Sequence, residues 1–137
     1  MKKQRILFLS FIITIFMFLA CSKDEVVNDI TSTNNVSIGH IDDTLGISIV
    51  AVNATASDKN TNVNFTKDTI DVSLSVTGYS NGEATITFSN EAMDSKIFFL
   101  NSNQSIGQES LLFTPTLVNV NVGTGYTGTV ALAAIAR

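Results

Sequence analysis

Polar and apolar residues alternate along much of the second half of the chain. In residues 70–77 every apolar side chain falls on one side of an extended backbone and every polar side chain on the other. Residues 84–89 and 118–122 repeat this pattern. A period of two is typical of half-buried β-strands, with one face on a core and the other in water. We therefore predict strands near residues 69–77, 83–89 and 118–122.

The first two of these strands are separated by Tyr79-Ser80-Asn81-Gly82. An Asn-Gly pair favours the positive φ angles of a tight hairpin turn. The sequence therefore predicts that strands 69–77 and 83–89 pair antiparallel.

Shorter apolar runs predict further strands at residues 47–52, 62–66, 96–100, 111–114 and 129–135, and residues 91–94 suit a single helical turn. About eight short strands with regular turn signals indicate an all-β domain, a single antiparallel two-sheet β-sandwich over residues 40–137. Within it, alternation predicts that one ring of the Phe98-Phe99 pair is buried and the other exposed or covered by a loop. The strand at 129–135 is apolar on both faces. Its alanines suit a close sheet or subunit contact, and the other interpretation is a strand covered by loops.

The N-terminal residues form a different kind of segment. Lys2, Lys3 and Arg5 precede a nearly uninterrupted apolar run at residues 6–20, which ends on Ala20. The run is shorter than the ~20 residues of a membrane-spanning helix. A basic start, a short apolar stretch and a small terminal residue are typical of a secretory signal peptide, which we assign to residues 1–20.

The end of the signal peptide carries the first resemblance to a known family. Residues 18–21 (Phe-Leu-Ala-Cys) resemble the lipobox of bacterial lipoproteins, although leucine is commoner where Phe18 stands. This resemblance implies cleavage before Cys21 and attachment of diacylglycerol, with its palmitate-type chains, to the Cys21 thiol. Several acyl chains anchor a protein stably in a membrane. Cys21 is the only cysteine, so the chain cannot form an internal disulfide.

The residues after Cys21 bear on location. Ser22 is not the aspartate that resembles an inner-membrane retention signal, and residues 22–25 (Ser-Lys-Asp-Glu) look like a surface-export signal. These resemblances imply the outer membrane, with the domain facing the cell surface. The other interpretation of the charges is a solvated start to a linker. Residues 26–39 are rich in Ser, Thr and Asn without a sustained period, and we interpret residues 21–39 as the lipidated cysteine and a flexible tether.

The spacing of the predicted strands in residues 71–137 and the segment Gly-Tyr-Thr-Gly-Thr-Val at 125–130 resemble those of small, uncharacterised bacterial lipoproteins with immunoglobulin-like or jelly-roll sandwiches. A shared fold implies no particular activity.

Net charge excludes one class of partner. The whole chain carries a formal charge of −4, and loss of the three basic residues of the signal peptide leaves five basic and twelve acidic side chains, or −7. An acidic protein repels phosphate backbones, so we expect no nucleic-acid binding.

The sequence contains no persuasive catalytic or cofactor motif. Residues 123–128 match G-x-G-x-x-G, but a strand follows where a dinucleotide site needs a helix. His40 is the only histidine, and the aspartates near it lack the spacing of a calcium loop. The acids at Glu83, Glu91, Asp94 and Glu109 stand in or beside turns. We therefore predict no enzyme activity, no cofactor and no metal.

Two tyrosines are the best candidates for ligand contact. Tyr79 and Tyr126 each end a Thr-Gly-Tyr segment in a glycine-containing turn, and they are the only tyrosines in a chain without tryptophan. Such rings can stack on a sugar or a protein surface. The alternative is that each ring folds back over the open end of the sandwich, with its hydroxyl bonded to the backbone.

The functional expectation is a non-enzymatic, lipid-anchored surface binding or adhesion module with a glycan or protein ligand. The alternative is a periplasmic accessory or structural subunit of an envelope assembly, packed through its C-terminal strand. The first hypothesis predicts a solvent-facing Tyr79 or Tyr126. The second predicts an uncovered flat edge or face at residues 130–135.

Overall fold

The structure, a computed structural model, describes residues 31–137. Nine strands follow one another in these residues, and none of the described residues forms a helix long and apolar enough to span a membrane. The strands are β1 (Thr33–Ile41), β2 (Thr44–Val52), β3 (Ser57–Asn62), β4 (Ile70–Asn81), β5 (Ala84–Ser89), β6 (Ser95–Phe99), β7 (Gln104–Leu111), β8 (Leu117–Val122) and β9 (Thr127–Ala136).

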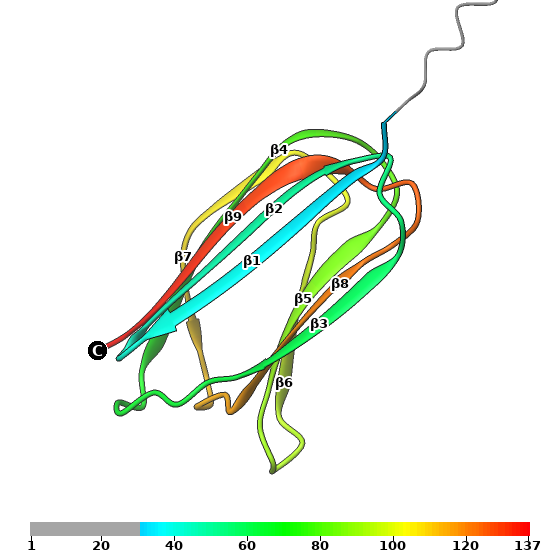
Figure 1. Ribbon diagram of the computed structural model, residues 1–137. Coiled ribbons are helices and arrows are strands. Elements are labelled where there is room, and N and C mark those ends of the chain that lie inside the picture. Colours follow the sequence, from blue (N-terminus) through cyan, green and yellow to red (C-terminus); the bar gives the residue numbers. More distant parts are fainter. Residues whose placement is uncertain (1–30) are drawn as a thin grey trace, which may run out of the picture.

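The strands form two antiparallel sheets that pack as a sandwich, which confirms the predicted fold class (Figure 1). One sheet has five strands in the order β1-β2-β9-β4-β7, and the other has four in the order β3-β8-β5-β6. The strands predicted at 47–52, 96–100, 118–122 and 129–135 correspond to β2, β6, β8 and β9. Period-two alternation located the strand at 118–122, and apolar runs located the other three, because the inward side chains of all four fill the space between the sheets.

The core confirms the expected split of the phenylalanine pair. Phe98 is 4% exposed and packs edge-on against Phe88, with ring centroids 5.9 Å apart. Phe99 is 61% exposed on the outer face of β6. Successive side chains of a strand point to opposite faces, so the two neighbours had to separate in this way.

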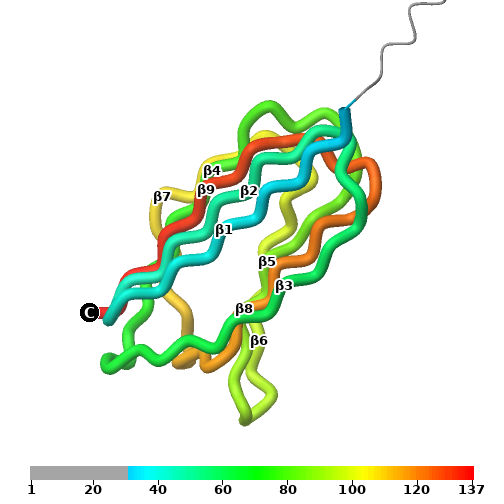
Figure 2. The backbone as a smooth tube through the Cα atoms, viewed as in Figure 1, coloured from blue at the N-terminus to red at the C-terminus, as the bar shows by residue number. Residues whose placement is uncertain are grey.

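The predicted hairpin between residues 69–77 and 83–89 is wrong. β4 pairs with β7 and β9, whereas β5 pairs with β6 and β8 in the other sheet. The Asn81-Gly82 turn therefore carries the chain from one sheet to the other (Figure 2). Gly82 has a φ of +81°, and a Cβ there would lie 2.5 Å from Tyr126 Cα. The glycine is needed for this tight crossing, which local sequence cannot distinguish from a hairpin turn.

The predicted tether extends too far into the domain. Residues 33–39 belong to β1, which pairs along its whole length with β2. Val36 and Ile38 pack against the core from this strand, and they are only half-buried because β1 lies at the edge of its sheet. The inward positions on either side of them, Asn34 and His40, are polar, so only two apolar residues mark the alternation in this strand. Cys21 and residues 21–30 of the tether, like the signal peptide, lie outside the described residues.

Two other strand predictions are wrong in position, because β3 shares only Asn62 with the first and β7 shares only Leu111 with the second. The strand expected at 62–66 is found as β3, whose inward residues Ser57, Lys59 and Thr61 are polar and give no hydrophobic period. The strand expected at 111–114 is found as β7, in which a bulge opposite Ser73 interrupts the alternation. The predicted helical turn at 91–94 is a loop between β5 and β6.

Lysine side chains bridge the two sheets along both sides of the sandwich. On one side Lys96 of β6 forms an ion pair with Glu109 of β7. On the other side Lys59 of β3 donates from Nζ to the Val36 carbonyl oxygen of β1, at 2.8 Å. Each lysine therefore connects an edge strand of one sheet with an edge strand of the other.

Candidate functional site: the outer face of the five-stranded sheet

Two adjacent rows of small side chains cross the outer face of the five-stranded sheet. The first row contains Ser37, Ser48, Ala131, Ser75 and Ser105. The second row contains Gly39, Gly46, Ala133 and Ser73, with Gly107 in the bulge beside Ser73. We call these ten positions the smooth face. Each row crosses all five strands without a side chain larger than serine.

The smooth face is the solvent side of strands whose other side forms the core. In β2, for example, Leu45, Ile47 and Ile49 are buried, while Gly46 and Ser48 between them are exposed. Exposed strand positions usually carry β-branched or aromatic residues, because these suit a pleated surface. In these two rows the outward positions are small on every strand, so the sheet backbone lies close to solvent there.

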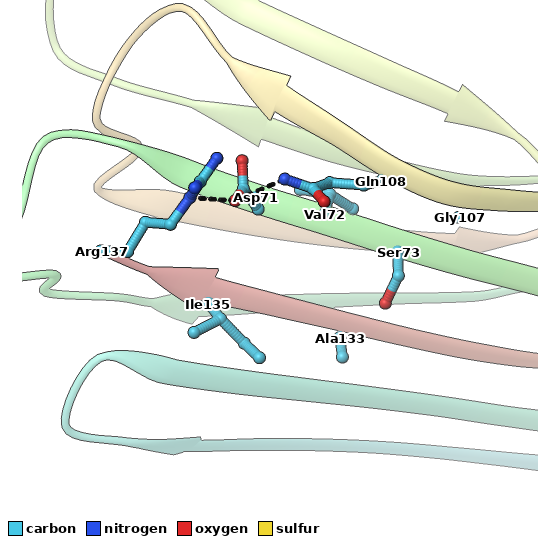
Figure 3. A pocket seen from close by; sticks show the side chains of 8 residues that line it. All are labelled: Asp71, Val72, Ser73, Gly107, Gln108, Ala133, Ile135 and Arg137. Carbon is cyan, nitrogen blue, oxygen red and sulfur yellow. Dashed lines mark hydrogen bonds and ion pairs between the residues drawn. The ribbon is translucent and has the colours of Figure 1, made fainter.

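The smooth face contains two shallow hollows. The first has a volume of about 390 Å³, and Figure 3 shows Ser73, Ala133 and Ile135 beside it on β4 and β9. The second has a volume of about 330 Å³ and shares Ser73, Gly107 and Ala133 with the first. The hollows therefore adjoin, and they arise where side chains are short rather than where the backbone opens.

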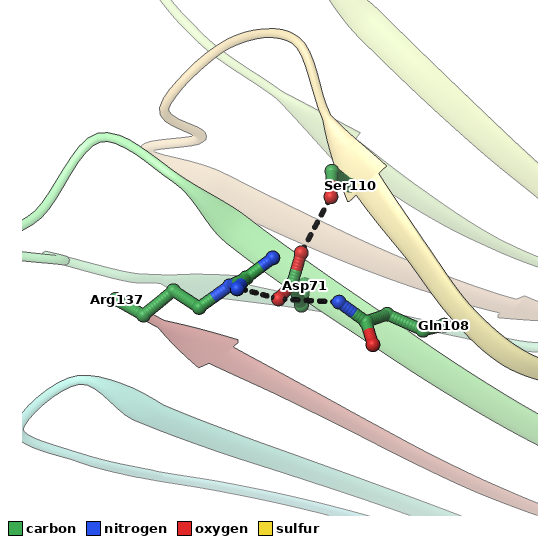
Figure 4. Close-up of polar contacts among 4 residues, drawn as sticks. All are labelled: Asp71, Gln108, Ser110 and Arg137. Carbon is green, nitrogen blue, oxygen red and sulfur yellow. Dashed lines mark hydrogen bonds and ion pairs between the residues drawn. The ribbon is translucent and has the colours of Figure 1, made fainter.

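A polar network borders the first hollow at the end of β9. Asp71 of β4 forms an ion pair with Arg137, accepts a hydrogen bond from Gln108 Nε2 at 2.8 Å, and accepts another from Ser110 Oγ at 2.5 Å (Figure 4). The Asp71 side chain is 14% exposed, whereas that of Arg137 is 62% exposed. The Asp71 carboxylate thus connects β4 with β7 and with the residue that follows β9, and the Arg137 side chain faces solvent.

These contacts stabilise the ionised form of Asp71. The hydrogen bond from Ser110 lowers the pKa of the Asp71 carboxyl group most, and the hydrogen bond and charge of Arg137 and the hydrogen bond from Gln108 lower it further against partial burial. A carboxylate held by three donors is a poor proton acceptor at neutral pH. The network therefore suits a fixed polar border more than acid–base chemistry.

Exposed apolar residues complete the border of the smooth face. Ile41 and Ile135, in the row next to the second small row, are 75% and 51% exposed. Val50, in the row next to the first, is 43% exposed. Ala131 and Ile135, on the outer side of β9, are exposed, so none of the loops within residues 31–137 covers this strand.

The two tyrosines lie at one end of the sandwich rather than on its surface. Their ring centroids are 6.1 Å apart. Tyr126 is fully buried, and its position does not fit the prediction that it contacts a ligand. Tyr79 is half-buried, and its hydroxyl donates to the Gly82 carbonyl oxygen at 3.0 Å. This is the folded-back arrangement that the sequence left as the alternative, and ligand contact at Tyr79 stays a prediction.

The Tyr126 hydroxyl has no hydrogen-bond partner among the described residues. Burial raises the pKa of Tyr126 to about 12, and the nearby Tyr79 contributes to the shift. Burial of the neutral phenol is therefore strongly preferred over burial of the phenolate.

The other candidates for chemistry have structural roles. The His40 ring packs edge-on against Phe65, with centroids 5.1 Å apart. The Asp43 carboxylate accepts hydrogen bonds from the Thr66 backbone N–H and hydroxyl, both at 2.7 Å, and these contacts lower its pKa. Within residues 31–137, no group of three or more His, Cys, Asp or Glu side chains could hold a metal ion.

Sequence reasoning found one strand of the candidate site, the alanine-containing β9, and missed the rest.

Comparison with known proteins does not assign the chain to a family. No protein-family model matches the chain, and no curated protein matches it.

Proposed function

We propose that this protein is a non-enzymatic lipoprotein, anchored in the bacterial outer membrane through lipid on Cys21, whose β-sandwich binds a protein partner. The observation that carries the proposal is the smooth face, with its apolar border at Ile41 and Ile135 and its polar border at Asp71 and Arg137. An uncovered face of this kind is typical of a contact surface.

The dimensions of the face suit a protein partner. With strands about 4.8 Å apart and about 3.3 Å per residue, the two rows of the smooth face cover roughly 300 Å², and the face with the bordering row on each side covers roughly 600 Å². Stable protein complexes bury about 800 Å² on each partner, so the face with its borders is close to that size. Open hollows of about 390 and 330 Å³ would leave much of a small molecule in solvent.

The side chains of the face also favour association on entropic grounds. Glycine and alanine lose no rotamer freedom when they are covered, and serine loses little. Long side chains can each lose about 0.5–1.5 kcal/mol on becoming immobilised at an interface. A partner that covers the smooth face therefore orders very few side chains.

A glycan ligand has less support. Sugar recognition relies strongly on exposed aromatic rings, and Tyr126 is buried while Tyr79 is half-buried with its hydroxyl bonded internally. The exposed Phe99 lies on the other sheet, away from the smooth face.

The second candidate function is a periplasmic accessory or structural subunit of an envelope assembly. The uncovered outer side of β9 favours it, because this is the feature expected of a subunit packed through its C-terminal strand. The two candidates use the same face and differ in location. Protease treatment of intact cells distinguishes them: release of a domain fragment into the medium places the domain outside, and release only after the outer membrane is opened places it in the periplasm.

A matched pair of variants tests the proposed face. Ala133→Arg adds a long charged side chain at the centre of the smooth face, and Thr87→Arg makes the same change on the outer face of β5 in the other sheet. Partners are captured with the membrane-anchored wild-type chain and compared with those of each variant. A partner lost with Ala133→Arg and kept with Thr87→Arg supports the proposal, whereas equal recovery with both variants contradicts it.

A further inference from the structure

The sandwich has four edge strands, and three of them carry features that discourage pairing with another chain. β3 presents Asp58 and Lys59, β6 is five residues long and contains Lys96, and β7 has a bulge and Glu109. Charges, short length and bulges are the usual means by which proteins protect exposed strand edges from edge-to-edge association.

The fourth edge strand, β1, has none of these features. It is nine residues long (Thr-Asn-Asn-Val-Ser-Ile-Gly-His-Ile), contains no Asp, Glu, Lys, Arg or Pro, and keeps an unbroken register with β2. Figure 1 shows it as the outermost strand of the five-stranded sheet. We propose that β1 pairs antiparallel with β1 of a second copy of this chain, which makes a two-fold symmetric dimer with one continuous ten-stranded sheet.

The backbone groups available for this pairing follow from the β1–β2 hairpin. Its loop has two residues, Asp42 and Asp43, so Ile41 and Thr44 form the hydrogen-bonded pair that closes the turn. Alternate residues then direct their N–H and C=O groups to the open edge, namely Asn34, Val36, Ile38 and His40. The contact from Lys59 Nζ to the Val36 carbonyl agrees with this orientation.

Symmetric pairing about Ser37 uses the whole strand. It sets Val36 opposite Ile38 of the partner subunit, and the reverse, and it gives about eight backbone hydrogen bonds. Val36 and Ile38 are half-buried against the core at the open edge, so the partner strand completes their burial. On the outer face Ser37 meets Ser37 of the partner subunit, so the smooth face continues across the dimer.

The same register brings together two unsatisfied polar groups. Among the described residues, the side chains of β1 contain two buried atoms without a hydrogen-bond partner, Asn34 Oδ1 and His40 Nε2. Buried polar atoms without partners are rare in folded proteins. Pairing about Ser37 sets Asn34 directly opposite His40 of the partner subunit, where an amide oxygen and an imidazole N–H are complementary. This correspondence selects a second copy over an unrelated extended segment.

Lys59 does not block the pairing. A carbonyl oxygen has two lone pairs, so Val36 can accept from Lys59 and from a backbone N–H of the partner strand together. The Asn34 side chain also has its oxygen available for the partner strand. Its hydrogen bonds use only the Nδ2 atom, which donates to the Thr55 carbonyl oxygen at 2.9 Å and to Ser57 Oγ at 2.8 Å.

Cysteine crosslinking of the full-length chain in intact cells tests the dimer. In the proposed register the two copies of residue 37 form a non-hydrogen-bonded pair with Cα atoms about 4.5 Å apart, which is within disulfide range. Ser37→Cys should therefore give a disulfide-linked dimer on mild oxidation. Ser105→Cys is the matched control, because Ser105 is an exposed serine in the same row at the opposite edge of the sheet. The unsubstituted chain controls for Cys21.

A dimer with Ser37→Cys and none with Ser105→Cys supports the proposal. No dimer with Ser37→Cys, or dimers in similar amounts with both variants, overturns it. Co-expression of Asn35→Cys and Gly39→Cys chains tests the register, because these positions are opposite each other across the axis. Their mixed disulfide is expected, whereas Asn35→Cys alone should not crosslink, because its two copies lie about 13 Å apart.

Discussion

The Tyr126 side chain folds back over Gly128, two residues further along the chain. A Cβ atom at position 128 would lie 2.9 Å from the Tyr126 hydroxyl oxygen and 3.2 Å from the adjacent ring carbon. Tyr126 has no exposed surface into which its ring could shift. The absence of a side chain at Gly128 therefore allows the largest residue of the core to be enclosed at this end of the sandwich.

Gly128→Ala should destabilise the domain by about 1–3 kcal/mol, because the added methyl group overpacks a closed core. Urea unfolding of the variant and the wild type measures the difference. Gly39→Ala is the control, since a Cβ there meets nothing within 4 Å. Adding Tyr126→Phe to Gly128→Ala removes the nearest clashing atom and should recover part of the loss. An unchanged midpoint for Gly128→Ala would contradict the close contact.

Tyr126 should make the domain sensitive to alkali. Its pKa is raised to about 12 in the folded state, whereas an unfolded tyrosine ionises near 10. The unfolded state therefore loses this proton first, so the contribution of Tyr126 to stability is fully present below pH 10 and is lost as the pH rises toward 12. Tyr126→Phe should flatten the decline in unfolding free energy between pH 9 and 11.5. A decline as steep as in the wild type would show that another group causes it.

The Asp71 network should make the domain more stable at neutral pH than at low pH. The folded-state pKa of Asp71 is lowered, so its contribution is present above the unfolded pKa of about 3.9 and is lost as the pH falls through the lower folded value. Ser110→Ala removes the largest cause and should raise the Asp71 pKa more than Gln108→Ala does. NMR titration of the Asp71 carboxyl carbon measures both. Equal or reversed effects would show that Ser110 is not the principal partner.

The proposed lipid attachment at Cys21 predicts that its loss changes the location of the protein and leaves the fold unchanged. Cys21→Ser should leave an uncleaved or soluble precursor that takes up no labelled palmitate, because no other cysteine can receive the lipid. The domain should still fold, since β1 and the core begin at Thr33. Cell fractionation with thermal unfolding of the product checks both statements. A mature, membrane-bound Cys21→Ser protein would contradict the lipoprotein assignment.

Much of the fold follows from the sequence because burial imposes its own period. Strands such as β4 and β5 alternate apolar and polar residues, and this pattern identified both strands and the two-sheet class. The alternation does not show which strands pair with each other. Asn81-Gly82 is compatible with a hairpin, and only the pairing of β4 with β9 and of β5 with β8 shows that the turn joins different sheets.

Most of the candidate site could not be predicted from the sequence, because it also depends on which strands are neighbours. Each strand contributes only two of the ten small residues, and glycine or serine at two outward positions is unremarkable on any one strand. The rows exist only after β1, β2, β9, β4 and β7 are set in register. Asp71 and Arg137 are likewise distant in the sequence and adjacent in the sheet. The alanines of β9 were noticed because they lie within one segment.

Photo-crosslinking in living cells tests the proposed binding face most directly. A photoreactive amino acid is placed in the full-length chain, either at Ala133 in the smooth face or, as the control, at Thr87 in the outer face of the other sheet. We predict a discrete crosslinked adduct with a protein from position 133 and none of the same size from position 87. Only monomeric chain from position 133, or the same adducts from both positions, would contradict the smooth face as the contact surface.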